Sequence, residues 1–284
     1  MQVVLVSPEG EVADPDSPVL HADDLGIVHG DGLFETMLVR EGRVCGLDRH
    51  LARLTAAAPV AGLPAPDPGR IEAMVRTGVR EWRSVHAGEG MLRLVYTRGR
   101  EHDPSGDPTL YLTIAPVPDR VESARRHGVR ALTLPTAYQP GLAATSPWLL
   151  SGVKSLSYAA NIAALRHVRG LGVDDAIFVS ASGTVLEGPR STVVAVIDGA
   201  LVTPPRDDGV LPGTTQDALF ELAESEGIGT DQRPLTVTEV YSADEVWLLS
   251  SVTLAARVRE LDGRACGAGS VIDVADLVHR SAGS

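Results

Sequence analysis

Lysine is nearly absent from this sequence. One of its 25 basic residues is a lysine, Lys154, and the other 24 are arginines, although lysine is ordinarily among the commonest residues of soluble proteins. Arginine stays protonated and is a poor nucleophile, whereas the amine of a lysine can lose its proton and condense with a carbonyl group. The one lysine therefore either occupies a position where a primary amine is chemically required or is a solvated surface residue.

The sequence around Lys154 favours a reactive amine. The residue lies in Ser151-Gly-Val-Lys-Ser-Leu-Ser-Tyr, between an apolar run at 148–150 and a stretch of small residues. Poor solvation by Val153 and Leu156 disfavours the charged ammonium form and so favours the nucleophilic neutral amine. A surface lysine would more often have charged neighbours. We therefore expect Schiff-base chemistry at Lys154.

Cysteines, long apolar runs and concentrated basic segments are also scarce. Cys45 and Cys266 stand far apart and outside any CxxC spacing, which argues against a disulfide framework, redox chemistry or a bound metal. No run approaches the roughly 18 apolar residues of a membrane span, and no secretory signal pattern is present. Acidic residues outnumber basic ones 37 to 25, which argues against nucleic acid as a partner. We expect a cytoplasmic protein without membrane contact.

The chain is long enough for two domains. With 284 residues, 44% of them hydrophobic, it can form one large core or two smaller ones. We expect an α/β (α+β) fold with an N-terminal α/β domain at 1–115, a proline-containing linker at 116–120 and a β-richer domain at 121–284. The expected elements include helices that begin at Asp48 and at Asp67-Pro68, strands at 33–44, 91–98, 109–115, 175–180, 184–187 and 245–249, a hairpin across Asp198-Gly199, and a helix after Gly213.

Three further features fit the needs of pyridoxal phosphate, which requires a Schiff-base lysine, a carboxylate at its ring nitrogen and an anion site for its phosphate. Glu187 ends a predicted strand, where its carboxylate can project into a cavity. Leu211-Pro-Gly-Thr-Thr-Gln opens a helix, whose N-terminal amides and hydroxyls are suited to phosphate. The guanidinium group of Arg53 can donate two parallel hydrogen bonds to the phosphate. Taken singly, an exposed glutamate and an ordinary threonine N-cap would be the plainer interpretations.

Six motifs occur along the chain in an order that indicates a family resemblance. The sequence resembles the class IV (fold type IV) pyridoxal-phosphate enzymes over nearly its whole length. That resemblance implies a two-domain subunit with a smaller N-terminal α/β domain and a larger, β-barrel-like C-terminal domain with helices, a homodimer, and a small amino substrate. The motifs are Asp24-Leu-Gly-Ile-Val-His-Gly-Asp-Gly-Leu-Phe-Glu-Thr, His50-Leu-Ala-Arg-Leu, Lys154-Ser-Leu-Ser-Tyr, Leu186-Glu-Gly-Pro-Arg-Ser-Thr, Leu211-Pro-Gly-Thr-Thr and Ser250-Ser-Val-Thr.

The resemblance also implies roles for individual residues. Lys154 would form the Schiff base and shuttle the proton, Glu187 would face the pyridine nitrogen, and Arg53 would bind the phosphate. Arg98 and His29 would meet the substrate. The remaining cofactor ligands, which would complete the hydrogen bonding of the phosphate, are Thr214, Thr215, Ser251 and Thr253.

Three positions depart from the family pattern. Thr192 stands where many members have Asn, and Gln216 where the helix motif often carries Arg; both changes concern packing behind the cofactor. His29 replaces the usual Tyr or Phe and so bears on the substrate. The loop at 98–107, with Arg100 and His102, either shapes specificity or is an ordinary polar loop.

Within the family, the sequence is most similar to the aminodeoxychorismate lyases, particularly at 151–167 and 187–196. That similarity implies elimination of pyruvate from 4-amino-4-deoxychorismate to give 4-aminobenzoate for folate synthesis. The alternative is a class IV aminotransferase acting on D-amino acids or branched-chain amino acids, because one lysine serves both reactions and Glu35 is compatible with either. A non-catalytic scaffold of the same fold is the remaining alternative, and the presence of Lys154 and Glu187 argues against it.

Overall fold

The computed structural model describes residues 3–103, 106–143, 145–267, 269–270 and 272–283. The chain forms two compact units. The first comprises Met1–Pro118 and Val153–Tyr158, and the second comprises Asp119–Gly152 and Ala159–Ser284. The predicted α/β (α+β) class is confirmed, since both units combine helices with sheets.

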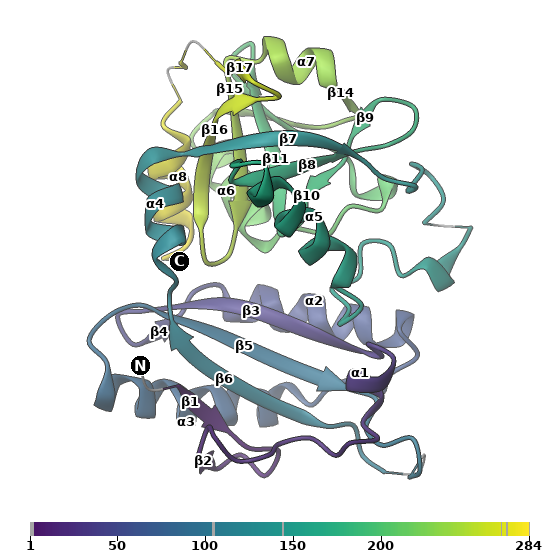
Figure 1. The fold of residues 1–284 in the computed structure, drawn as a ribbon. Coiled ribbons are helices and arrows are strands. Elements are labelled where there is room, and N and C mark those ends of the chain that lie inside the picture. Colours follow the sequence, from purple (N-terminus) through teal and green to yellow (C-terminus); the bar gives the residue numbers. More distant parts are fainter. Residues whose placement is uncertain (1–2, 104–105, 144, 268, 271, 284) are drawn as a thin grey trace. The chain divides into compact units, whose positions relative to one another are not determined.

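The first unit is built on an antiparallel sheet with the strand order β2-β1-β6-β5-β3-β4 (Figure 1). Its longest pairing joins β3 to β5 over eight residue pairs, from Gly32 opposite Thr97 to Val39 opposite Gly90. The predicted strands at 33–44, 91–98 and 109–115 are therefore present. The strands are β1 (Val4–Val6), β2 (Val12–Ala13), β3 (Gly32–Arg40), β4 (Arg43–Val44), β5 (Gly90–Thr97) and β6 (Leu110–Pro116).

Helices α2 (Leu47–Val60) and α3 (Pro68–Val85) pack against this sheet (Figure 1). Their buried apolar side chains form a core with those of the strands. The side chain of Asp67 accepts a hydrogen bond from the amide of Gly69 and caps α3, as predicted. The prediction that Asp48 caps α2 is wrong. Gly46 is the N-cap, because its left-handed backbone turns the chain into the helix two residues earlier. The shared core includes Leu51, Leu54, Ile71, Met74, Trp82, Leu92, Leu94, Leu112 and Ile114.

The segment Val153–Tyr158 groups with the first unit, although the sequence analysis assigned 121–284 to one continuous second domain. The segment runs antiparallel to the start of β3. The amide of Phe34 donates to the carbonyl of Lys154 (3.1 Å), and the amide of Leu156 donates to the carbonyl of Gly32 (2.8 Å). These long-range hydrogen bonds attach the lysine to a buried strand rather than to the elements that flank it in the sequence.

Gly32 allows this close approach. A Cβ at this position would lie 2.7 Å from the carbonyl oxygen of Tyr96 and 2.9 Å from the Cα of Thr97, and neither backbone atom can yield easily. We expect Gly32→Ala to lower the free energy of unfolding by about 1–3 kcal/mol, the usual range for overpacking, in urea denaturation of the apoprotein. Gly88→Ala, which adds its Cβ where no atom lies within 4 Å, is the matched control; equal effects of the two substitutions would contradict the prediction.

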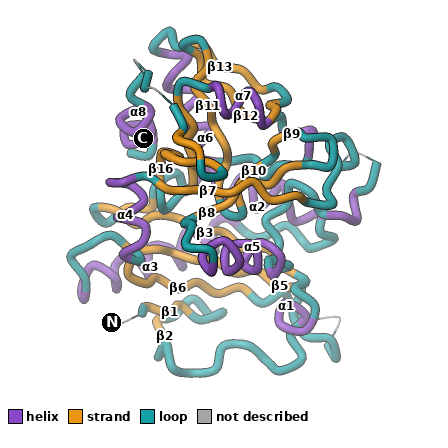
Figure 2. The backbone as a smooth tube through the Cα atoms, turned by 45° about the horizontal axis from the view of Figure 1, so that its top comes forward, coloured by secondary structure: helices purple, strands orange, loops and turns teal. Residues whose placement is uncertain are grey.

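The second unit contains a larger sheet with the strand order β13-β12-β11-β15-β16-β7-β8-β9-β14, to which β10 and β17 are attached (Figures 1 and 2). The pairs β16–β7, β7–β8 and β12–β13 are parallel, and the other pairs are antiparallel. The strands are β7 (Val129–Pro135), β8 (Asp175–Val179), β9 (Thr184–Val185), β10 (Glu187–Gly188), β11 (Ser191–Ile197), β12 (Ala200–Thr203), β13 (Gly229–Gln232), β14 (Leu235–Thr236), β15 (Glu245–Ser250), β16 (Leu254–Leu261) and β17 (Arg264–Ala265).

Helices and turns complete the second unit. The predicted hairpin across Asp198-Gly199 joins β11 to β12, and both turn residues have positive φ. The predicted helix after Gly213 is α6 (Thr214–Ser225), which contacts α8, β13 and β15. Figure 2 shows the helices and strands of this unit along the backbone. The other helices are α4 (Asp119–His127), α5 (Ala159–Gly170), α7 (Val237–Ser242) and α8 (Val274–Ser281), with short 3-10 turns at Pro147–Leu149 and Arg206–Asp208.

Candidate active site

The residues predicted to bind cofactor and substrate divide between the two units. The first unit holds Lys154, Arg53, Arg98 and His29. The second unit holds Glu187, Thr214, Thr215, Ser251 and Thr253.

Lys154 lies on the extended segment beside β3, with a partly buried side chain. Its Nζ is 4.5 Å from the ring centroid of Phe34 and 5.6 Å from that of Tyr158. The two rings meet edge to face at 5.2 Å. Aromatic faces attract an ammonium group without donating or accepting its proton, so they hold the amine in place and leave its chemistry intact.

Arg53 is anchored by a buried carboxylate. Its Nε and Nη2 donate to the two oxygens of Glu35 at 2.8 and 2.6 Å, the parallel arrangement that arginine forms with carboxylates. The Nδ1 of His50 lies 2.7 Å from Oε2 of the same glutamate. His50 and Arg53 are three residues apart on α2, which places them on one face of the helix toward β3. The sequence indicates Arg53 as a phosphate ligand but gives no sign of its contact with Glu35.

Burial and charge together determine protonation in this cluster. Burial raises the pKa of Glu35, but the charge of Arg53 and the hydrogen bonds from His50 and Arg53 outweigh it and lower that pKa to about 2. For His50, burial lowers the pKa despite the neighbouring carboxylate. The glutamate is therefore ionised at neutral pH and can only accept hydrogen bonds. It follows that the hydrogen of the neutral imidazole is on Nδ1.

Arg98 and His29, the predicted substrate residues, lie near α1 (Leu25–Val28). Arg98 forms a forked ion pair with Asp31 and donates to the carbonyls of Ala61 (2.8 Å) and Gly62 (2.9 Å) at the end of α2. Its hydrogen bond to Asp31 raises its pKa. These contacts tie β5 to the loop after α2. His29 is the C-cap of α1 and its side chain is exposed.

In the second unit, most of the singled-out residues lie close to the start of α6. Glu187 on β10 is paired with Thr192 on β11, and its Oε2 accepts a hydrogen bond from the amide of Leu211 (3.0 Å). The hydroxyls of Thr214 and Ser251 are 3.3 Å apart. Two short strands, a loop and a helix terminus thereby bring a carboxylate and a pair of hydroxyls into one region.

The start of α6 fits a phosphate. Its N-cap is Gly213, which has no side chain to cap the amides of the first turn. A Cβ at this position would lie 2.3 Å from the hydroxyl oxygen of Thr192. Thr214 is buried and Thr215 is partly buried. The buried Nε2 of Gln216 has no hydrogen-bond partner among the described residues. Amides, hydroxyls and an amide side chain at a helix N-terminus form an environment that favours an anion.

The turn that contains Ser251 and Thr253 is supported from α4. The Oγ of Ser250 accepts from the amide of Thr253 (3.3 Å). Arg125 donates to the carbonyls of Val252 (2.6 Å) and Thr253 (3.2 Å). The arginine therefore fixes the carbonyl side of the turn. No motif in the sequence singles out Arg125, because it belongs to a polar helix with several charged residues.

The loop at 98–107 carries its own charged cluster. The Nε of Arg100 donates to Asp23 (3.0 Å), and Nδ1 of His102 lies 3.2 Å from the same carboxylate. The bond to Arg100 lowers the pKa of Asp23 to about 2. Pro104 and Ser105 lie outside the described residues.

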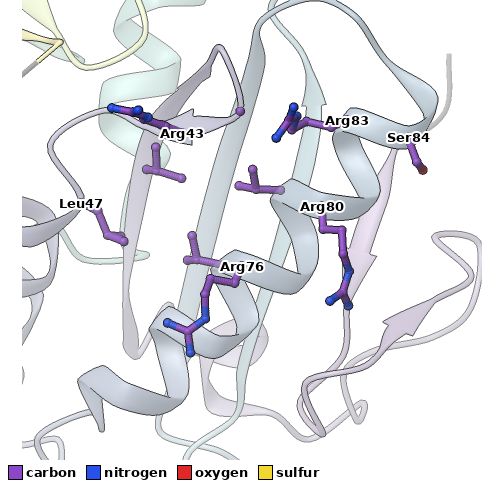
Figure 3. A pocket seen from close by; sticks show the side chains of 10 residues that line it. Arg43, Leu47, Arg76, Arg80, Arg83 and Ser84 are labelled. Carbon is purple, nitrogen blue, oxygen red and sulfur yellow. The ribbon is translucent and has the colours of Figure 1, made fainter.

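A separate cavity of about 600 Å³ lies between β4 and α3 (Figure 3). Arg43, Arg76, Arg80 and Arg83 surround an apolar floor there, and Figure 3 shows that their guanidinium groups point in different directions. It includes none of the predicted cofactor residues. Within the described ranges, no three His, Cys, Asp or Glu residues cluster as metal ligands, and no helix is long and apolar enough to cross a membrane.

Comparison with known proteins places this geometry among characterised folds. The family model of class IV amino-transferases matches residues 32–261. A relative in Mycobacterium tuberculosis, described as a bifunctional aminodeoxychorismate lyase / D-amino acid transaminase, is 48% identical over 268 residues, which is 92% of each chain.

Solved structures agree with this match. A hypothetical aminotransferase from M. tuberculosis in its PLP-bound form superposes with a TM-score of 0.94 at 47% identity, covering 98% of each chain. A fold IV transaminase from Curtobacterium pusillum superposes with a TM-score of 0.88 at 38% identity, covering 98% of this chain and 97% of the other. The predicted fold type is therefore confirmed.

Proposed function

Because the chain belongs to the class IV amino-transferase family of pyridoxal-phosphate enzymes, we propose that it is a 4-amino-4-deoxychorismate lyase that releases pyruvate and 4-aminobenzoate for folate synthesis. The observation that carries this proposal is the extensive similarity to the M. tuberculosis relative, whose description includes the lyase activity. Lys154, the ionised cluster around Arg53, and the anion-favouring start of α6 supply the functional groups that the reaction needs.

Bound pyridoxal phosphate supplies an aldehyde for the substrate amine and a ring that withdraws electrons from the adjacent carbon. The chain supplies the remaining functions. The Nζ of Lys154 holds the cofactor and, once released, accepts the proton from the substrate carbon that bears nitrogen. The carboxylate of Glu187 holds a proton on the ring nitrogen. The phosphate is bound by Arg53 and by the N-terminus of α6. The side chains that complete its hydrogen bonding are Thr214, Thr215, Ser251 and Thr253.

The two reactions of the family diverge after the proton reaches Lys154. In the lyase reaction, the bond to the enolpyruvyl ether oxygen breaks, pyruvate leaves, and the substrate ring becomes aromatic. Aromatisation provides a driving force that an ordinary amino acid lacks. In transamination, Lys154 would instead give this proton back without loss of a leaving group, and hydrolysis would release a keto acid while the amino group stayed behind. The same amine serves both outcomes.

D-amino acid transamination is the second candidate, because the description of the M. tuberculosis relative names both activities. A bifunctional enzyme requires only that one binding pocket accept an amino substrate with either fate. His29, which stands where relatives usually have Tyr or Phe, is the position at which we expect the preference between these substrates to be affected.

Parallel assays test the proposal. Purified holoenzyme is supplied with 4-amino-4-deoxychorismate, and pyruvate release is measured; in a second assay, D-alanine or a branched-chain amino acid is paired with 2-oxoglutarate. We expect pyruvate release to be the faster reaction, with slower transfer from D-alanine. Transfer of the amino group to 2-oxoglutarate in the second assay, with no pyruvate released from 4-amino-4-deoxychorismate in the first, would overturn the lyase proposal and leave the transaminase. The Lys154→Arg protein provides the background rate for both assays.

A further inference from the structure

We propose that Glu35 is a positioning residue that holds the guanidinium group of Arg53 in the orientation required by a phosphate-bearing ligand. This inference rests on the proposed role of Arg53 as a phosphate ligand and deepens it by naming the group that acts through the arginine. Glu35 lies on β3, and Arg53 projects toward it from α2.

The geometry leaves Arg53 little rotational freedom. Two hydrogen bonds from Nε and Nη2 to the two oxygens of one carboxylate fix both the position and the plane of the guanidinium group. The side chain of Arg53 is 11% exposed and that of Glu35 is 1% exposed, so surrounding atoms reinforce this arrangement. An arginine that is ordered before the ligand arrives loses less side-chain entropy when it binds.

His50 fixes the carboxylate in turn. Its Nδ1 lies 2.7 Å from Oε2, the oxygen that also accepts from Nη2 of Arg53. Because Glu35 is ionised, the imidazole donates this hydrogen bond. Both donors come from one face of α2, so the carboxylate joins the helix to the central strand through two side chains at once.

As a purely structural salt bridge, these groups would add little to the stability of the fold. Burying an ionised carboxylate carries a desolvation cost that its partners only partly recover, and apolar replacements often stabilise a protein equally well. The arrangement is explained if the fixed arginine is needed for binding. Burial lowers the pKa of His50 despite this carboxylate and keeps the imidazole neutral, so the positive charge offered to an anion from this cluster is that of Arg53.

Binding of two related ligands to the apoprotein tests the proposal. Pyridoxal 5′-phosphate and pyridoxal share the aldehyde and ring, but only the first carries the phosphate. We expect Glu35→Gln to weaken the affinity for pyridoxal 5′-phosphate about tenfold, the scale of one charge-assisted hydrogen bond, and to leave the affinity for pyridoxal unchanged. Affinities are measured by titration of the Schiff-base absorption band and by quenching of tryptophan fluorescence.

Several variants make the result specific. Combining Glu35→Gln with Arg53→Gln should weaken phosphate-ligand binding no further than Arg53→Gln alone, because the glutamate acts through the arginine. Glu89→Gln removes the partner of Arg40 in a more exposed ion pair of the same unit and should change neither affinity. If Glu35→Gln does not fold, Glu35→Asp retains the charge while shortening the reach and should show the same selective loss.

The outcomes separate this inference from the proposed function. Equal losses for pyridoxal 5′-phosphate and pyridoxal would mean that Glu35 only maintains the fold, and this inference would be overturned. A further loss in the double variant would place its action outside Arg53, with the same consequence. If the unsubstituted apoprotein bound neither ligand, the proposed function would fail as well.

Discussion

Lys154→Arg is expected to lower kcat for either candidate reaction by at least about 10³-fold, the combined scale of a lost nucleophile and a lost proton carrier. Arginine retains the positive charge that lies over the rings of Phe34 and Tyr158. It cannot form the Schiff base or release a proton near neutral pH. Steady-state kinetics measures the loss, and circular dichroism with thermal denaturation shows whether the fold is retained.

Chemical trapping checks the assignment independently of turnover. Because Lys154 is the chain's single lysine, borohydride reduction of the holoenzyme should attach the cofactor to one internal peptide, identified by mass spectrometry. The Lys154→Arg protein should carry no label at that peptide. Substantial turnover by this variant, or a label confined to the N-terminal amine, would contradict the central role of Lys154.

Local signals in the sequence were sufficient to predict many of the elements. Asp67-Pro68 begins α3 because a capping carboxylate and a proline in the first turn act within a few residues. Asp198-Gly199 forms a hairpin turn because both residues accept positive φ. The boundary of α2 was less accurate, since a left-handed glycine can cap a helix without any side-chain signal.

Long-range pairing could not be read from these local patterns. The hydrogen bond from the amide of Phe34 to the carbonyl of Lys154 connects residues 120 positions apart in sequence, and nothing near either residue identifies the other. The same applies to Glu35 and Arg53, whose two motifs were recognised separately. Sequence order identified the family and its candidate residues, whereas the ion pair became visible only when β3 and α2 were placed together.

Arg98 illustrates a different difficulty. From the sequence, an arginine at the end of a predicted strand is a reasonable carboxylate receptor. The structure gives its guanidinium group an internal carboxylate, Asp31, and two backbone carbonyls. A sequence motif identifies the type of side chain but not the groups to which it forms hydrogen bonds. A contact of Arg98 with substrate would therefore compete with these internal hydrogen bonds.

Glu187→Gln is expected to lower kcat by about 100-fold, because a charge-assisted hydrogen bond to the cofactor ring nitrogen is replaced by a neutral one. The substitution is conservative for the fold. The amide oxygen of glutamine can still accept the hydrogen bond that Leu211 donates to Oε2 at 3.0 Å, and the side chain keeps its length. The substitution removes the negative charge that, in the proposed role of Glu187, holds a proton on the ring nitrogen.

The measurement therefore compares activity with stability. For Glu187→Gln, kcat should fall while the thermal denaturation midpoint of the apoprotein stays close to that of the unsubstituted chain. Glu122→Gln, which removes an exposed carboxylate paired with Arg126 on α4, is the control for losing one negative charge and should leave kcat unchanged. A Glu187→Gln protein that kept most of its kcat would show that the ring nitrogen does not depend on this carboxylate. A matching fall in the apoprotein midpoint would instead assign Glu187 to maintaining the loop at Leu211.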